Sequence, residues 1–264
     1  MAIERPPDET TTPAEPAPTV APVTVRDATT PTPITRQFVR FAFYRVRPEW
    51  RLRDSGQRAA DRHEVASLAR DTAARDGVVL RTYSLVGTRG DADFMLWLVS
   101  ENLDELHNFS ASLNATALAA YLEQPYHYFA MTKRSMYVDK HEHPNQEGRS
   151  NRLVIVPGGR KYLFVYPFVK TRSWYRLSAA ERQRQMDEHI GTGHRYPGVR
   201  INTTYSFGLD DQEFVVAFES DSAADFLDLV QEMRGSEAST HTVRDTPSFT
   251  CIAMPIEDAL AAIG

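Results

Sequence analysis

The chain of 264 residues has a single cysteine, Cys251. One thiol excludes an internal disulfide framework and a cysteine-rich metal site. Because Cys251 lies between Thr250 and Ile252 in an apolar stretch, we expect a buried core thiol rather than a nucleophile. The usual Gly-rich phosphate loop and the Gly-x-Ser-x-Gly nucleophile elbow are also missing, and the pair Gly158-Gly159 alone is a weak signal. Several common catalytic and nucleotide-binding sites are therefore not expected.

The sequence also has no long hydrophobic run and no long basic run. No stretch approaches the roughly 18 apolar residues of a membrane span. The net charge is −5, so neither a membrane segment nor a nucleic-acid surface is indicated. Residues 1–35 are rich in proline and threonine, have almost no large hydrophobic side chains, and lack the pattern of a signal peptide. We expect a cytoplasmic protein with a disordered N-terminal tail.

The rest of the chain contains the same series of elements twice. Thr82-Tyr83-Ser84 followed by Asp93-Phe94 has an echo in Thr204-Tyr205-Ser206 followed by Glu213-Phe214. Tight hairpin turns are expected at 89–91 and 210–212. The first series predicts strands at 38–46, 79–88, 92–100 and 126–138, with helices at 57–75 and 103–122. The second predicts strands at 161–170, 199–209, 213–220 and 248–254, with a helix at 178–194 and another that begins at Ser222.

Each series has the order βαββαβ, which is typical of a ferredoxin-like unit. The predicted fold class is therefore α+β, with two tandem ferredoxin-like halves at 36–138 and 161–264. Residues 139–160 are polar and rich in turn formers at both ends, so they form the predicted linker. Two such sheets can face each other and form a barrel-like core with helices outside, as in dimeric α/β-barrels.

Two residues of the second half are candidates for chemistry. His189 shares a helix face with Met186, Ile190 and Gly193, which leaves room for a flat group to approach. It is either a partly buried structural histidine or an axial ligand whose neutral imidazole binds iron.

Tyr166 shares a strand face with Tyr162, Phe164 and Phe168, so a plain aromatic core stripe is the alternative to a functional role. Basic Lys170 and Arg172 follow Tyr166 and suit a ligand that carries carboxylates. Trp174 and Tyr175 add flat surface. His141-Glu-His143 is better interpreted as a solvated turn than as a metal site.

Five motifs in register, strongest from residue 160 onward, resemble the chlorite dismutase-like family, and most closely its coproheme decarboxylases. The resemblance covers roughly residues 36–255. The motifs are Tyr166-Pro-Phe-Val-Lys170, Trp174-Tyr175, Met186-Asp-Glu-His189, Gly208-Leu-Asp-Asp211 and Arg234-Gly-Ser-Glu-Ala-Ser239.

The resemblance implies a role for each matching residue. His189 matches the proximal iron ligand, and Glu237 matches the acid that hydrogen-bonds this histidine. Tyr166 matches the tyrosine that serves as a radical relay. Lys170 and Trp174 match pocket residues near the porphyrin, and Ser239 matches a propionate contact of some members.

The position of the distal arginine of true chlorite dismutases is occupied here by Ile201. Arg200 is one place away on a strand and should point to the opposite face, so chlorite chemistry is disfavoured. Some decarboxylases carry a distal histidine where this chain has Arg149. Whether Arg149, His143 or no residue serves as the distal base stays open.

The implied reaction is the hydrogen peroxide-dependent decarboxylation of Fe-coproporphyrin III (coproheme) to haem b through a three-propionate intermediate. Coproheme is then both substrate and cofactor. The alternatives are a haem-binding peroxidase, a chlorite dismutase-like enzyme or a haem carrier, and more remotely a barrel protein without haem. The resemblance also implies a homopentamer, and the pathway implies a ferrochelatase as a possible partner.

Overall fold

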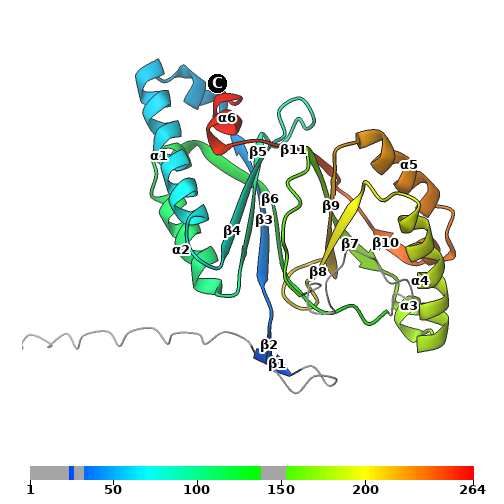
Figure 1. The fold of residues 1–264 in the computed structure, drawn as a ribbon. Helices are drawn as coiled ribbons and strands as arrows, with labels where there is room; N and C mark the ends of the chain where they lie inside the picture. Colours follow the sequence, from blue (N-terminus) through cyan, green and yellow to red (C-terminus); the bar gives the residue numbers. More distant parts are fainter. Residues whose placement is uncertain (1–23, 27–32, 138–152) are drawn as a thin grey trace, which may run out of the picture.

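The computed structural model describes residues 24–26, 33–137 and 153–264 (Figure 1). The two predicted halves share one order of elements, as the repeat in the sequence requires. The first half contains β3 (Phe38–Val46), η1 (Pro48–Leu52), α1 (Ser55–Ala73), β4 (Val78–Ser84), β5 (Phe94–Ser100), α2 (Leu103–Asn114), η2 (Leu118–Tyr121) and β6 (Leu122–Met131). The second half contains β7 (Tyr162–Lys170), α3 (Arg172–Arg176), α4 (Ala179–His194), β8 (Arg200–Tyr205), β9 (Phe214–Ser220), α5 (Ala223–Met233), η4 (Glu237–His241), β10 (Thr242–Arg244) and β11 (Phe249–Ala253), followed by α6 (Ile256–Ala261).

The strands of both halves form one closed antiparallel sheet. Hydrogen bonding runs in the order β7-β11-β4-β5-β3-β6-β8-β9, and pairing of β9 with β7 closes the ring, with β10 added beside β7. Within each half the order is that of a ferredoxin-like sheet, so the predicted α+β fold with a barrel-like core is confirmed. The halves join where β11 pairs with β4 and where β6 pairs with β8. The second junction has a single register pair, Met131↔Tyr205.

Within the part of the chain that the structure describes, three hydrophobic clusters hold the fold together. Alternation along each strand sends one set of side chains into the barrel and the other outward. The inner cluster takes Phe41, Trp97, Val165 and the predicted core thiol Cys251, which is fully buried. The outer sets pack beneath helices: α1 and α2 cover the first half, and α3 to α5 lie on the side of the second (Figure 1). No helix in the described ranges is long and apolar enough to cross a membrane.

Several local predictions need correction. The strand-to-strand turns lie earlier than expected, around Gly87 and Gly208, whose positive φ angles of 84° and 73° favour glycine. The helix predicted to reach Leu122 ends at Asn114. The short elements α3, η4, β10 and α6 were not predicted. The predicted disorder of the tail is wrong for residues 24–26 and 33–35, which pair as strands β1 (Thr24–Arg26) and β2 (Pro33–Thr35).

Proline within a sheet is usually confined to an edge strand or a strand end, yet Pro167 lies in β7, which is an interior strand. On one side it pairs continuously with β9, including Pro167 with Val215. On the other side, β11 pairs with β7 up to Val165 and β10 pairs from Val169 onward. Because proline has no backbone N–H, its place opposite this break removes no ladder hydrogen bond there.

Candidate functional site

Tyr166 lies in the middle of β7, with its side chain on the outer face of the second half. As predicted, it shares this face with Phe164 and Phe168, and its ring lies 5.9 Å from that of Phe218. Burial raises the pKa of the phenol, Asp245 raises it further and Arg234 opposes the change. Tyr166 is therefore a neutral, half-buried phenol at physiological pH.

His189 lies on α4, which begins where the predicted capping box places it. The Ser178 hydroxyl accepts the Glu181 N–H at 3.1 Å. Burial lowers the pKa of His189 to about 4, the charge of Lys170 lowers it too, and Glu188 opposes these effects. Within the described residues the imidazole makes no hydrogen bond. A neutral imidazole with no protein partner can ligate a metal.

Lys170 ends β7 and brings a cation to the same region. Its Nζ donates a hydrogen bond to the Ala238 carbonyl at 2.7 Å and lies 4.3 Å from the centroid of the Trp174 ring. Burial lowers the pKa of Lys170 to about 8, and the nearby Glu213 carboxylate opposes this. The lysine is therefore still mostly charged at neutral pH, in surroundings that favour a counter-charge.

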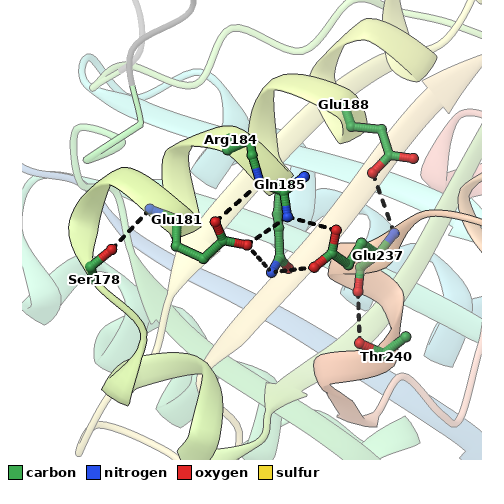
Figure 2. A network of polar contacts seen from close by, with 7 residues as sticks. All are labelled: Ser178, Glu181, Arg184, Gln185, Glu188, Glu237 and Thr240. Atoms are coloured by element: carbon green, nitrogen blue, oxygen red, sulfur yellow. Dashed lines mark hydrogen bonds and ion pairs between the residues drawn. The ribbon is translucent and has the colours of Figure 1, made fainter.

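Glu237 contacts other partners than the one predicted (Figure 2). Its carboxylate accepts hydrogen bonds from Arg184 at 2.6 Å and from Gln185 at 3.1 Å, both on α4. Among the described residues the predicted hydrogen bond to His189 is not formed, so this prediction is wrong for the structure. The Arg184 guanidinium carries a full charge and outcompetes a neutral imidazole for the carboxylate.

Ser239 is engaged locally. Its hydroxyl contacts the Arg234 carbonyl at 2.8 Å and the Ser236 carbonyl at 2.6 Å, where the chain leaves α5. These contacts close the last turn of the helix. Its contact with a ligand stays a prediction.

The register of β8 decides which side chains face the site. Ile201 pairs with Phe218 and lies on the outer face with it, whereas Arg200 pairs with buried Glu219 on the other face. The prediction that Arg200 points away is thus confirmed. Ile201 is 50% exposed, and Phe207 at the following turn is 47% exposed. Part of this face is therefore open, apolar and suited to a flat ligand. Arg149 and His143 lie outside the described residues.

The first half shows what the fold alone requires. β3 and β7 have nine residues each, so aligning them end to end pairs Ala42 with Tyr166 and Val46 with Lys170. Ala42 and Val46 are fully buried core residues. The phenol and the ammonium are therefore additions of the second half.

The helices give the same result. Counted from the N-caps Asp54 and Ser178, Val65 on α1 takes the place of His189 on α4. Val65 is fully buried in the outer core of the first half. The imidazole therefore replaces a core aliphatic side chain and is not required by the fold.

Trp174 and Glu237 differ in this comparison. Trp50 follows β3 as Trp174 follows β7, and both indoles are buried. A buried tryptophan at this position is thus part of the fold, whatever else Trp174 contacts.

The position of Glu237 is held by Ala117 in the first half. The Ala117 N–H donates to Glu64, as the Glu237 N–H donates to Glu188. The carboxylate of Glu237, like His189, belongs to the second half only.

Glu213 is a further residue of this region that the sequence did not single out. Its buried carboxylate accepts the Lys170 backbone N–H at 2.8 Å and the Tyr175 hydroxyl at 2.5 Å. The available signal was the change from Asp93-Phe94 to Glu213-Phe214 between the two repeats. It is informative only once the partners are known.

Comparisons with known proteins agree with this arrangement. The family model described as "Chlorite dismutase" matches residues 58–254. A coproheme decarboxylase from Mycolicibacterium smegmatis is 30% identical over 231 residues, which cover 87% of this chain and 95% of the relative. Among solved structures, a variant chlorite dismutase from Candidatus Nitrospira defluvii has a TM-score of 0.75 at 24% identity, covering 86% of this chain and 95% of its own. A complex of that enzyme with imidazole has a TM-score of 0.75 at 23% identity, covering 86% and 94%. Similarity at these identities supports the fold.

Proposed function

The chain belongs to the chlorite dismutase family, and on this premise we propose that it is a hydrogen peroxide-dependent coproheme decarboxylase. Fe-coproporphyrin III is the proposed substrate, and haem b is the product of two successive decarboxylations through a three-propionate intermediate. The similarity to the mycobacterial coproheme decarboxylase supports this reaction over others of the family.

The observation that carries the proposal is the state of His189. Its imidazole is neutral, free of protein hydrogen bonds among the described residues, and placed where the first half has Val65. His189 is half-buried, and an imidazole nitrogen that makes no hydrogen bond within the described residues can bind a group from outside the chain. An iron porphyrin fits: His189 would hold its iron, the apolar face around Ile201 would contact the ring, and Lys170 would face a propionate.

Each decarboxylation is a two-electron oxidation. A bound iron porphyrin would supply these two oxidising equivalents together with peroxide. Tyr166 gives up one electron and its phenolic proton, and the resulting tyrosyl radical takes a hydrogen atom from the β-carbon of a propionate. The propionate then loses carbon dioxide and a second electron to become a vinyl group. Peroxide takes up both electrons and ends as two molecules of water, so each step balances.

Burial suits Tyr166 to this role. Because its pKa is raised, the phenol keeps its proton until an oxidant removes the electron and the proton together. Abstraction also requires contact with the propionate, and a residue in the middle of a strand is held rigidly. Lys170 would hold a carboxylate or supply a proton.

The rival functions need fewer of these residues. A haem-binding peroxidase or haem carrier would need His189 but not Tyr166. Chlorite dismutation is disfavoured because Ile201, rather than an arginine, lies on the open face of β8.

Product analysis separates the candidates. Ferric coproheme III is mixed with the protein, peroxide is added in steps, and the porphyrins are followed by mass spectrometry. We expect two successive losses of carbon dioxide plus two hydrogens, with haem b at the end. Binding without mass loss would leave a carrier or peroxidase, and no binding would remove the proposal.

We also propose a cellular setting and an oligomeric state for the enzyme. Its place in haem synthesis requires a coproporphyrin ferrochelatase to supply the substrate in the cytoplasm. The family resemblance favours a homopentamer. Sedimentation velocity of the purified chain tests the latter.

A further inference from the structure

The Glu213 carboxylate connects three parts of the proposed site. Its Oε2 accepts the backbone N–H of Lys170 at 2.8 Å and the hydroxyl of Tyr175 at 2.5 Å. Its Oε1 lies 3.8 Å from the exposed Arg172 guanidinium. Because its charge is buried, each of these hydrogen bonds is stronger than one between neutral groups. The carboxylate thus ties the end of β7 to α3.

The first half contains the same clamp in a simpler form. Asp93 accepts the backbone N–H of Val46 at 2.7 Å, as Glu213 accepts that of Lys170. The backbone N–H of each acid donates in turn to a carbonyl of the strand whose end it binds. Asp93 donates to Tyr44 of β3 at 2.8 Å, and Glu213 donates to Phe168 of β7 at 3.2 Å. An acid that fixes the end of the strand is therefore a requirement of the fold.

The second half differs from the first at three linked positions. Val46 of the first half corresponds to Lys170, Asp93 to the longer Glu213, and Arg51, which follows the tryptophan that both halves share, to Tyr175. The Arg51 side chain donates instead to the Ile263 carbonyl. The longer acid and the hydroxyl that it binds occur in the half that carries the lysine.

We propose that Glu213 is a positioning residue of the porphyrin site: by binding Tyr175 and the Lys170 backbone together, it fixes the turn from β7 into α3 and so holds the Lys170 ammonium where a ligand carboxylate binds. The inference rests on the proposed function, because it assigns Lys170 to a propionate. The position of Lys170 itself can be tested in the protein without ligand.

The first half supplies the informative variant. Glu213→Asp gives the second half the same acid that the first half has at Asp93. The shorter side chain should still accept the Lys170 N–H but lose the Tyr175 hydroxyl. Tyr175→Phe removes the same hydrogen bond from the other side. If both variants act through this bond, the double variant should be no more affected than the more affected single one. Asp93→Asn is the matched control in the first half.

Acylation of lysines in the ligand-free protein measures the position of Lys170. The protein is treated with an amine-acetylating reagent, and the rate at Lys170 is compared by peptide mass spectrometry with that at exposed Lys161. We expect Glu213→Asp and Tyr175→Phe each to accelerate labelling of Lys170 about three- to tenfold. This is part of the roughly ten- to hundredfold that one charge-assisted hydrogen bond is worth, because the bond acts on the lysine through the backbone. Asp93→Asn should leave the ratio unchanged. The Tyr175→Phe variant keeps Glu213 and its hydrogen bond to the Lys170 N–H and loses only the hydroxyl. An unchanged labelling ratio in this variant overturns the proposal.

Titration with ferric coproporphyrin III, followed by its Soret absorption, tests the link to the ligand. We expect about tenfold weaker binding in Glu213→Asp and Tyr175→Phe and unchanged binding in Asp93→Asn. Unchanged affinity in the first two would overturn the assignment of Lys170 to a carboxylate. If the unaltered protein binds no coproporphyrin, the proposed function fails, while the labelling result still decides whether Glu213 positions Lys170.

Discussion

His189 on α4 and Val65 on α1 occupy the same position in the two halves of the barrel, counted from their N-cap residues. Val65 is fully buried, whereas His189 is half-buried and has no hydrogen bond among the described residues. One half of a repeated fold thus serves as a reference for the other. Residues that differ at equivalent positions, rather than those that agree, mark the candidate site.

This relationship predicts the effect of His189→Val. The variant installs the residue that the first half uses, so the free energy of unfolding of the ligand-free protein should stay within about 1 kcal/mol of the original. The variant removes the proposed iron ligand, so the absorption spectrum of bound ferric coproheme should change. Urea unfolding and a Soret titration measure the two effects. A spectrum identical to that of the unaltered protein would contradict the ligand assignment.

Lys170→Met should change stability in a pH-dependent way. The folded-state pKa of Lys170 is about 8 against an ordinary value of 10.5, so the unfolded chain binds more protons between these values. The stability that Lys170 costs at pH 7 is therefore recovered as the pH rises from about 8 to 10.5. We expect the variant to be more stable by roughly 1 to 2 kcal/mol at pH 7, with a smaller gain at pH 10.

Urea unfolding of both proteins at the two pH values measures this difference. The same variant should bind coproheme more weakly, because the ligand carboxylate loses its cation. A gain in stability that does not change with pH would show that burial of the charge is not its cause.

Asp210 of the Gly-Leu-Asp-Asp motif should contribute to stability rather than to ligand binding. Its Oδ2 accepts the Phe129 N–H at 2.7 Å and the Gln212 amide at 2.8 Å, which fastens the β8–β9 turn of one half to β6 of the other. Among the described residues, β6 and β8 share a single register pair, Met131↔Tyr205. Asp210→Ala should lower the free energy of unfolding by about 2 to 3 kcal/mol.

Asp211→Ala is the matched control for Asp210→Ala. The Asp211 side chain is exposed, so its removal should change stability by less than about 0.5 kcal/mol. Thermal unfolding of both variants and coproheme titration check the comparison. Equal losses of stability, or a loss of coproheme affinity in Asp210→Ala at full stability, would contradict the structural role.

The fold was largely predictable from the sequence because its signals are local. Alternation gave β3 and β7, the Ser178 capping box gave the start of α4, and the echo of Thr82-Tyr83-Ser84 in the second half gave the repeat. The turns were misplaced because the residues with positive φ, Gly87 and Gly208, precede the polar residues that suggested hairpins.

The site was less predictable because its contacts join residues far apart in the chain. The family motif suggested Glu237 as the partner of His189, but Arg184 on the same helix carries the charge that the carboxylate binds. Glu213 could not be identified because nothing in its neighbourhood along the chain reveals Tyr175 as its partner. The hydrogen-bond partners of Glu237 and Glu213 are therefore set by tertiary contacts, which local sequence patterns do not encode.

The most direct test of the account is the reaction of Tyr166→Phe. The variant and the unaltered protein are loaded with ferric coproheme III and given equal portions of peroxide, and the porphyrins are analysed by mass spectrometry. Phenylalanine keeps the ring that packs against Phe218 but cannot release a phenolic hydrogen, so coproheme should bind normally and retain all four propionates. Formation of haem b by the variant at the rate of the unaltered protein would contradict the role assigned to Tyr166.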